Sequence, residues 1–164
     1  MSNAIAIVKA QKVLSANEID QTTKNYKKEN MKIVFTNGCF DLLHIGHVRY
    51  LEQAKSRGDI LIVGINTDAS VQKLKGPTRP IQNENDRAEI LASLKAVDHT
   101  VLFNEETPLE LIKTIKPDIL VKGGDWKIQQ IVGWDFVQSY GGLVESLQFV
   151  EGRSTTQIIE KSKT

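Results

Sequence analysis

Short apolar, β-branched runs alternate along the chain with longer amphipathic segments, and this alternation predicts the fold class. The apolar runs are nearly continuous, which is typical of strands covered on both faces of a sheet. They predict strands at 32–37, 59–66, 99–103, 118–124 and 143–149. The amphipathic segments predict helices at 46–56, 68–74, 84–96, 109–115 and 128–140, and a last helix from Thr155. Strands separated by crossover helices predict an α/β fold, a doubly wound, five-stranded parallel sheet with helices on both faces.

Residues 1–30 precede the first predicted strand and contain the charged run NEIDQTTKNYKKEN. We interpret them as a helical N-terminal lead-in and not as a second domain. The whole chain of 164 residues is one domain of ordinary size, long enough to bury a core. We therefore expect one functional site, carried by residues 31–164.

Composition changes this picture mainly by excluding partners. The 21 Lys and Arg residues are interspersed with 20 Asp and Glu, so no basic patch of the kind that binds nucleic acid is indicated. No segment has the length of a membrane span, and the N-terminus lacks a signal-peptide pattern, so we expect no membrane partner and a cytoplasmic location. The single cysteine, Cys39, excludes an internal disulfide and fits a reducing compartment.

Three unusual stretches fall at the carboxyl ends of predicted strands, where ligands bind in open parallel sheets. They are TNGCFDLLHIGH, VKGGDW and EGRSTTQ. In the first, His44 and His47 flank Gly46 at the start of a helix. Rings three residues apart can point the same way, and the N–H groups and dipole of a helix N-terminus favour an anion. The pair therefore indicates a phosphate-binding corner.

The stretch EGRSTTQ is a second predicted helix start, with three hydroxyl side chains in a row: Ser154, Thr155 and Thr156. Alone, these hydroxyls would be interpreted as helix caps. Together with the histidine corner, they are interpreted as phosphate ligands.

Three other roles for the histidines compete with this one. A zinc site could use Cys39, His44 and His47, but the usual zinc-ligand spacings are missing and His99 lies on a predicted strand. Cys39 could be a nucleophile with a histidine base, although a cysteine at a strand end is more often a small buried filler. Histidines that are satisfied locally in a packed turn are the third alternative.

The stretch GCFDLLHIGHVRYL resembles the signature of the HxGH nucleotidylyltransferase superfamily, with a glycine, Phe40, Asp41 and both histidines in register. RSTTQII resembles the second signature of that superfamily. Within it, the chain is most similar to the D-glycero-β-D-manno-heptose 1-phosphate adenylyltransferases in LKGPTRPIQNENDRAEILASLKAVDHTVLF, PDILVKGGDW and EGRSTTQIIEK. The resemblance runs from Met31 to Lys161, and it implies a Rossmann-like nucleotidyltransferase domain over 31–164.

The resemblance implies an enzyme that transfers AMP from ATP to heptose 1-phosphate, giving ADP-heptose and pyrophosphate for lipopolysaccharide or another surface glycan. The related glycerol-3-phosphate cytidylyltransferases read R-T-x-G-I-S-T-T near the end. Here Phe149 stands at the position of that arginine and Arg153 directly precedes Ser154. Two alternatives stay open: a cytidylyltransferase acting on glycerol 3-phosphate or a similar alcohol phosphate, and a non-catalytic nucleotide-binding module.

By the same resemblance, His44 and His47 stabilise the pentavalent phosphorus and the leaving group. Lys75 is a third candidate catalytic residue, because it lies with Arg79 in the Gly/Pro-rich stretch KLKGPTRP, which we interpret as a lid that clamps both phosphates. The residues expected to bind the nucleotide are Thr36, Asn37, Gly38, Phe40, Asp41, Gly46, Lys122, Gly123, Asp125, Trp126, Ser154, Thr155 and Thr156.

The residues expected to bind the second substrate are Arg79, Arg87 and Arg153. Arg87 has two plainer interpretations, an exposed charge or a partner of Glu84. Asp41 has another as well, because it can fix the turn without touching a ligand. Trp126 is equally well interpreted as a core or rim aromatic.

No protein metal site is expected, and Mg²⁺ is expected through the nucleotide phosphates. The resemblance also implies a homodimer. Because such activity is often fused to a sugar kinase domain that this sequence does not contain, we expect a separate kinase to supply the phosphorylated sugar.

Overall fold

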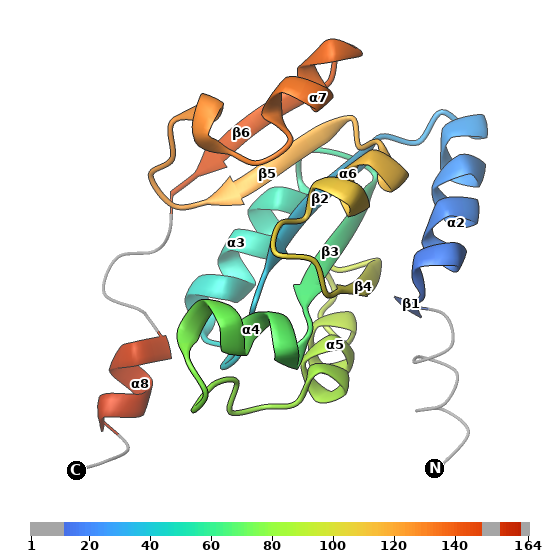
Figure 1. Cartoon of the computed structure of the whole chain (residues 1–164). Coiled ribbons are helices and arrows are strands. Elements are labelled where there is room, and N and C mark those ends of the chain that lie inside the picture. The colour runs from blue at the N-terminus through green and yellow to red at the C-terminus, as the bar shows by residue number, and fades with distance from the viewer. Residues whose placement is uncertain (1–11, 149–154, 162–164) are drawn as a thin grey trace.

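A computed structural model describes residues 12–148 and 155–161 of the chain (Figure 1). Its strands form one parallel sheet in the order β1-β4-β3-β2-β5-β6. The strands are β1 (Val13–Leu14), β2 (Ile33–Gly38), β3 (Ile60–Asn66), β4 (His99–Phe103), β5 (Ile119–Gly123) and β6 (Leu143–Leu147). The five predicted strands are confirmed to within two residues at each end.

The prediction of five strands is nevertheless wrong, because β1 adds a sixth strand at the edge of the sheet. It has two residues, Val13 and Leu14, which pair with Thr100 and Val101 of β4. Two residues are too few to give a period-2 pattern, so this strand is defined by its pairing with β4 and not by its own sequence.

The helices agree with the prediction in number and order, with two differences. They are α2 (Ala16–Lys28), α3 (Ile45–Lys55), α4 (Asp68–Lys75), α5 (Glu84–Ala92), α6 (Leu109–Ile115), α7 (Trp134–Ser139), α8 (Thr155–Lys161) and the 3₁₀ turn η1 (Ile128–Gln130). The helix expected at 128–140 is split into η1 and α7. Gly133 between them has φ of +87°, and a Cβ there would lie 2.9 Å from the side chain of Ile112, so a continuous helix does not fit. Helix α5 ends at Ala92, where a turn replaces the last residues of the predicted helix.

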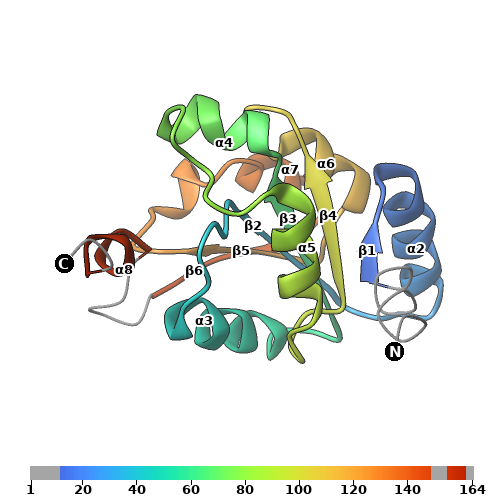
Figure 2. The same cartoon turned by 90° about the horizontal axis from the view of Figure 1, so that it is seen from below.

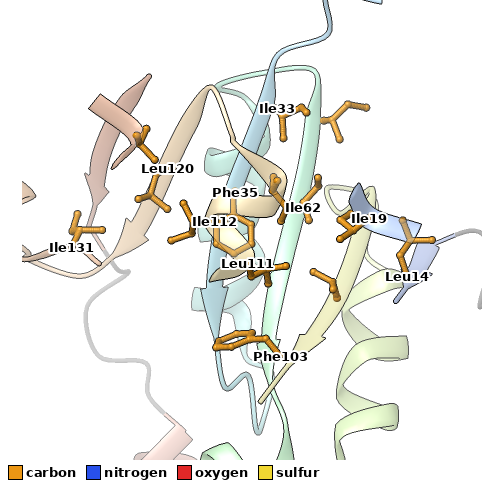
Figure 3. Close-up of a cluster of buried hydrophobic side chains, with 14 residues drawn as sticks. Leu14, Ile19, Ile33, Phe35, Ile62, Phe103, Leu111, Ile112, Leu120 and Ile131 are labelled. Atoms are coloured by element: carbon orange, nitrogen blue, oxygen red, sulfur yellow. The ribbon is translucent and has the colours of Figure 1, made fainter. Parts of the chain in front are cut away.

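Helices cover both faces of the sheet, so the doubly wound architecture is confirmed (Figure 2). On one face, side chains of the sheet pack with those of α2, α6 and α7. Figure 3 shows Phe35 of β2 lying beside Leu111 and Ile112 of α6 in this cluster. On the other face, a second cluster joins the sheet to α3 and α5 through Leu51 and Leu91, both fully buried.

The N-terminal helix α2 belongs to the same packed unit. Its residue Ile19 is fully buried in the first core cluster, and the hydroxyl of Tyr26 lies 2.7 Å from Nε2 of His99 on β4. The expected helical character of this segment is confirmed, and Ser15 and Glu18 form a capping box at its start. None of the helices in residues 12–148 and 155–161 is long and apolar enough to cross a membrane.

The strand order places a switch point at the centre of the sheet. From β2 the chain winds to β3 and β4 on one side, and then returns to β5 and β6 on the other side. The connections that leave the carboxyl ends of β2 and β5 therefore diverge and leave a crevice between them. Asn37 and Gly38 end β2, and Lys122 and Gly123 end β5, so these four residues face that crevice.

Candidate active site

A pocket of about 200 Å³ lies at this switch point. Eight of its ten lining residues were predicted from the sequence to bind nucleotide or act in catalysis, and the other two are Cys39 and Tyr50. The lining is Asn37, Gly38, Cys39, Phe40, Asp41, His47, Tyr50, Lys75, Lys122 and Gly123. The fold thus brings together the β2–α3 turn, the end of β5 and the end of α4 (Figure 1).

The two histidines form the N-terminus of α3. His44 is the N-cap, and its Nδ1 accepts a hydrogen bond of 3.2 Å from the backbone N–H of Gly46. Nδ1 of His47 accepts a bond of 3.4 Å from the backbone N–H of His44, and the two ring centroids are 3.9 Å apart. Because Nδ1 is the acceptor in both neutral rings, the ring proton is placed on Nε2. The pair therefore presents neutral N–H donors at a helix N-terminus.

Burial, together with smaller effects of the nearby His44 and Lys75 in the same direction, lowers the pKa of His47 to about 4. The imidazole is therefore neutral near pH 7 in the free protein. A hydrogen bond from its Nε2, and not a full positive charge, is what His47 offers to an incoming phosphate.

Two lysines supply the positive charge of the pocket. Lys75 ends α4 on the exposed rim, and it makes no salt bridge in the described part of the chain. Lys122 ends β5 on the opposite side, and its Nζ donates to Oδ1 of Asn37 at 3.4 Å. Burial lowers the pKa of Lys122, while Cys39 opposes that shift. An anion in this pocket would lie between two cations from different elements.

The turn after β2 is shaped by Phe40. This residue has φ of +47°, and its ring lies over Gly38, where a Cβ would come within 3.0 Å of the ring. The ring also contacts His47 edge to face, with centroids 5.4 Å apart. Phe40 thus keeps the backbone of the turn open and holds the His47 ring in place, while only 8% of it is exposed.

Asp41 is buried and binds the loop between α4 and α5. Its carboxylate accepts from Nε of Arg79 and from the backbone N–H groups of Ile81, at 2.7 Å, and Gln82, at 3.1 Å. Burial alone would raise the pKa of Asp41, but these hydrogen bonds and the Arg79 charge outweigh it and hold the pKa below its usual value. The geometry fits the interpretation that Asp41 fixes the turn, and it engages Arg79 before any ligand is present.

Thr36 and Tyr50 lie beneath the pocket. Thr36 is fully buried, and its hydroxyl is 2.6 Å from that of Tyr50, which is 3.5 Å from the carbonyl of Val121 on β5. Burial raises the pKa of Tyr50 to about 12, so the phenol stays protonated. Sequence reasoning missed Tyr50, although its position three residues after His47 places both on one face of α3.

Arg87 is placed differently from both plainer interpretations of its sequence position. It is neither an exposed charge nor a partner of Glu84, because its side chain is fully buried and its carboxylate partner is Asp68. Nη2 donates to Asp68 at 2.8 Å, Nη1 to the carbonyl of Cys39 at 2.6 Å, and Nε to the carbonyl of Gln82 at 3.1 Å. These three bonds place Arg87 where it supports the turn at Cys39, and its role in substrate binding stays a prediction.

Asp125 and Trp126 lie on the surface beyond the end of β5. Trp126 is 46% exposed, and its indole N–H donates to the carbonyl of Gly123 at 3.1 Å while its backbone N–H donates to Ser146. A core role for Trp126 is therefore excluded. Its ring is held at the rim of the sheet, where it can cover a bound group.

The described residues contain no group of three or more His, Cys, Asp and Glu side chains that could hold a metal ion, which removes the zinc interpretation of Cys39, His44 and His47. Cys39 lines the pocket, and its Sγ lies 3.9 Å from Oδ1 of Asn66. Asp41, the buried carboxylate of the pocket, is already engaged by Arg79 and two amides.

Part of the predicted site cannot be placed. Arg153 and Ser154 lie outside the described residues. Thr155 and Thr156 begin α8, but their side chains are outside the description as well. Figure 1 shows α8 on the side of the molecule where the strands have their carboxyl ends.

A pocket at the carboxyl ends of parallel strands, at the switch point of the sheet, is the usual ligand site of an open α/β domain. Residues 35–161 match the model of the cytidylyltransferase-like family, and the chain belongs to that family. It is 62% identical over 130 residues to the bifunctional protein HldE of Citrifermentans bemidjiense, covering 79% of this chain and 27% of that protein. It is 57% identical over 135 residues to the bifunctional protein HldE of Syntrophotalea carbinolica, covering 82% of this chain and 28% of that protein.

The chain thus spans less than a third of the length of these curated relatives. Among solved structures, it is similar to the lipopolysaccharide core biosynthesis protein from Thermoplasma volcanium, with a TM-score of 0.60 and 31% identity. That match covers 75% of this chain and 99% of the other. The predicted membership in the HxGH nucleotidyltransferases and the Rossmann-like fold are both confirmed.

Proposed function

We propose that the chain transfers AMP from ATP to D-glycero-D-manno-heptose 1-phosphate, giving ADP-heptose and pyrophosphate. The observation that carries this proposal is the switch-point pocket lined by His47, Lys75 and Lys122, with the His44 ring 3.9 Å from that of His47 at the start of α3. High identity to bifunctional HldE proteins and a match to a lipopolysaccharide core biosynthesis protein support the sugar branch.

In the proposed reaction, a phosphate oxygen of the sugar phosphate attacks the α-phosphorus of ATP in line, and the bond to the pyrophosphate oxygen breaks. The attacking phosphate is already ionised near neutral pH, so no general base is needed. The protein must align the two phosphates and stabilise the charge that develops on the equatorial and leaving oxygens. Donors that are fixed before the substrate arrives do this without reorganisation during the reaction.

The described residues can meet these two requirements. His44 and His47 would donate from Nε2 to phosphate oxygens, since both Nδ1 atoms accept bonds within the turn. Lys75 and Lys122 would approach the phosphates from opposite sides of the pocket. Asn37, Gly38 and Gly123 would line the nucleotide site, and Trp126 and Asp125 would cover it from the rim.

A divalent cation is expected with the nucleotide, because four phosphate charges exceed what two lysines neutralise. The donor set of the pocket does not fit a metal cage, since Asp41 is engaged by Arg79 and amide groups. A metal held by protein side chains is therefore not part of the proposed reaction, and Mg²⁺ carried by the nucleotide phosphates stays a prediction.

A second candidate follows from the family itself, whose description is cytidylyltransferase-like. In that case the same pocket would take CTP and a small alcohol phosphate such as glycerol 3-phosphate. The chemistry at the α-phosphorus is identical in both candidates, so the histidines do not separate them. The two candidates differ in the nucleotide base and in the phosphate that accepts the nucleotidyl group.

The test is pyrophosphate release with Mg²⁺, measured for ATP and CTP against heptose 1-phosphate, hexose 1-phosphates and glycerol 3-phosphate. Turnover confined to ATP with heptose 1-phosphate is the expected result. Turnover with CTP and glycerol 3-phosphate would keep the mechanism and replace the substrates. No turnover in any combination, with nucleotide still bound, would point to the non-catalytic binding module.

The remaining partners are part of the same proposal. We expect a homodimer, a cytoplasmic location and a sugar kinase activity that supplies the heptose 1-phosphate. We also retain the division into a lead-in over 1–30 and a nucleotidyltransferase domain over 31–164. Sedimentation of the purified chain tests the dimer, and deletion of residues 1–30 with assay of the remainder tests the division.

A further inference from the structure

Arg87 and Asp41 are the only Lys, Arg, Asp or Glu side chains classed as buried in the part of the chain that the structure describes. Both bind the same two segments. Asp41 lies in the turn after β2 and accepts from Ile81 and Gln82, while Arg87 donates to the carbonyls of Cys39 and Gln82. A buried charge costs free energy unless it is fully paired. Two buried charges at the junction of the same two segments are therefore stable only because their hydrogen bonds hold these segments together.

Arg87 lies on a helix that is packed firmly against the sheet. It lies in the first turn of α5, whose residues Ala88 and Leu91 are fully buried against the sheet. The hydroxyl of Thr100 on β4 also donates to the carbonyl of Ala88. The guanidinium therefore projects from a helix that is fixed to the central strands.

The third bond of Arg87 reaches the start of α4. Nη2 donates to Asp68, the first residue of that helix, and the backbone N–H of Asp68 donates to Glu84 at the start of α5. Helix α4 runs from Asp68 to Lys75, and Lys75 lines the pocket. Because an α-helix rises by about 1.5 Å per residue, a tilt of α4 at Asp68 displaces Lys75 at the other end of the helix.

We propose that Arg87 is a positioning residue for nucleotidyl transfer, which fixes Lys75 relative to the histidine pair by tying the start of α4 to the turn at Cys39. A planar guanidinium suits this role, because its donors can reach three segments at fixed angles, whereas a lysine ammonium cannot. The inference rests on the proposed function for its kinetic test, whereas its spectroscopic test holds whichever substrates the protein takes.

The kinetic test compares Asp68→Asn and Arg87→Lys with Lys75→Met, each alone and combined with Lys75→Met. Asp68 is one-third exposed, and Asp68→Asn keeps the shape of the side chain while weakening its bond to Arg87 by removing the carboxylate charge. We expect each single variant to lower kcat by about tenfold, because small misplacements of a phosphate ligand are costly. Arg57→Met is the matched control, since it removes a half-exposed arginine–carboxylate pair with Glu145 away from the pocket, and it should leave kcat unchanged.

The combined variants decide the question. If Arg87 acts through Lys75, adding Asp68→Asn or Arg87→Lys to Lys75→Met should slow turnover by no more than about twofold further. Effects that multiply in the double variants would overturn the proposal and leave Arg87 with a general role in stability.

The spectroscopic test does not need turnover. Lys75 lowers the pKa of His47, so Lys75→Met should raise that pKa in an NMR titration, and Asp68→Asn should raise it in the same direction. An unchanged His47 pKa in Asp68→Asn would contradict the proposal. An inactive wild-type protein that still gives the expected NMR shifts would count against the proposed function and in favour of the role of Arg87.

Discussion

Two hollows among the described residues are each lined by more than one lysine, and only one of these two has the properties of a site. The larger, about 580 Å³, lies between α2 and α6, and the smaller, about 200 Å³, lies at the switch point. In the larger hollow each lysine already has a partner within the protein. These contacts are Lys24 with Asp20, Lys113 with Glu110, Lys27 with the carbonyl of Ile115, and Lys116 over the ring of Tyr140.

The switch-point pocket differs in its topology and in the state of its charges. It lies at strand ends and at a helix N-terminus, and Lys75 on its rim forms no salt bridge within the described residues. An anion entering it gains contacts that the protein does not already make. Strand topology and a lysine without a carboxylate partner therefore identify the candidate site, whereas the volume of a hollow does not.

His47→Ala is the change with the largest expected effect. We expect kcat to fall by more than about a hundredfold, because the variant removes a donor that is aimed at developing charge. Nucleotide binding should change much less, since that donor matters most in the transition state. Steady-state kinetics and calorimetric titration with ATP measure both quantities, and unchanged turnover would remove His47 from the mechanism.

Lys75→Met sharpens the contrast between the two hollows. It should reduce kcat by about tenfold, since one of the two cations of the pocket is lost. Lys113→Met in the other hollow is the matched control, because it removes a lysine that is paired at the surface, and it should leave activity unchanged. An equal loss of kcat in the two variants would contradict the claim that only the switch-point pocket is the site.

The stability of the protein should fall in acid between about pH 6.5 and pH 4 in a manner that depends on His47. The pKa of His47 is about 4 in the folded protein and 6.5 in its ordinary state, so between these values the unfolded chain holds more protons. The contribution of neutral His47 is complete above pH 6.5 and is lost as the pH falls through 4. The melting temperature should depend less steeply on pH across this range for His47→Ala than for the wild type. The same dependence in both proteins would argue against a buried neutral ring.

Tyr50→Phe has the smallest expected effect. It removes a hydroxyl that contacts Thr36 and the carbonyl of Val121 below the pocket, and a lost buried hydrogen bond costs about 1–3 kcal/mol. Denaturant unfolding should record this loss, while kcat changes by less than about threefold, since the ring still lines the pocket. A large loss of kcat with unchanged stability would show that the phenol itself meets a substrate.

The sequence predicted the features that are encoded locally. Strand β3 is buried at all seven positions, which matches its continuous apolar run, and His44 and His47 meet because helical spacing brings them together. The features that it missed depend on distant partners. The carbonyl that Arg87 binds is 48 positions away in the sequence, and β1 exists through its pairing with β4. Such contacts leave no periodic pattern, so one sequence could not indicate that Arg87 is buried.

The most direct test of the account is an NMR titration of the protein with ATP and Mg²⁺, in which the signals of the two hollows are followed together. We predict that the ring signals of His47 and the backbone signals of Gly38 and Gly123 shift, while those of Lys24 and Lys113 stay in place. Shifts confined to the α2–α6 hollow would contradict the claim that the switch-point pocket is the nucleotide site.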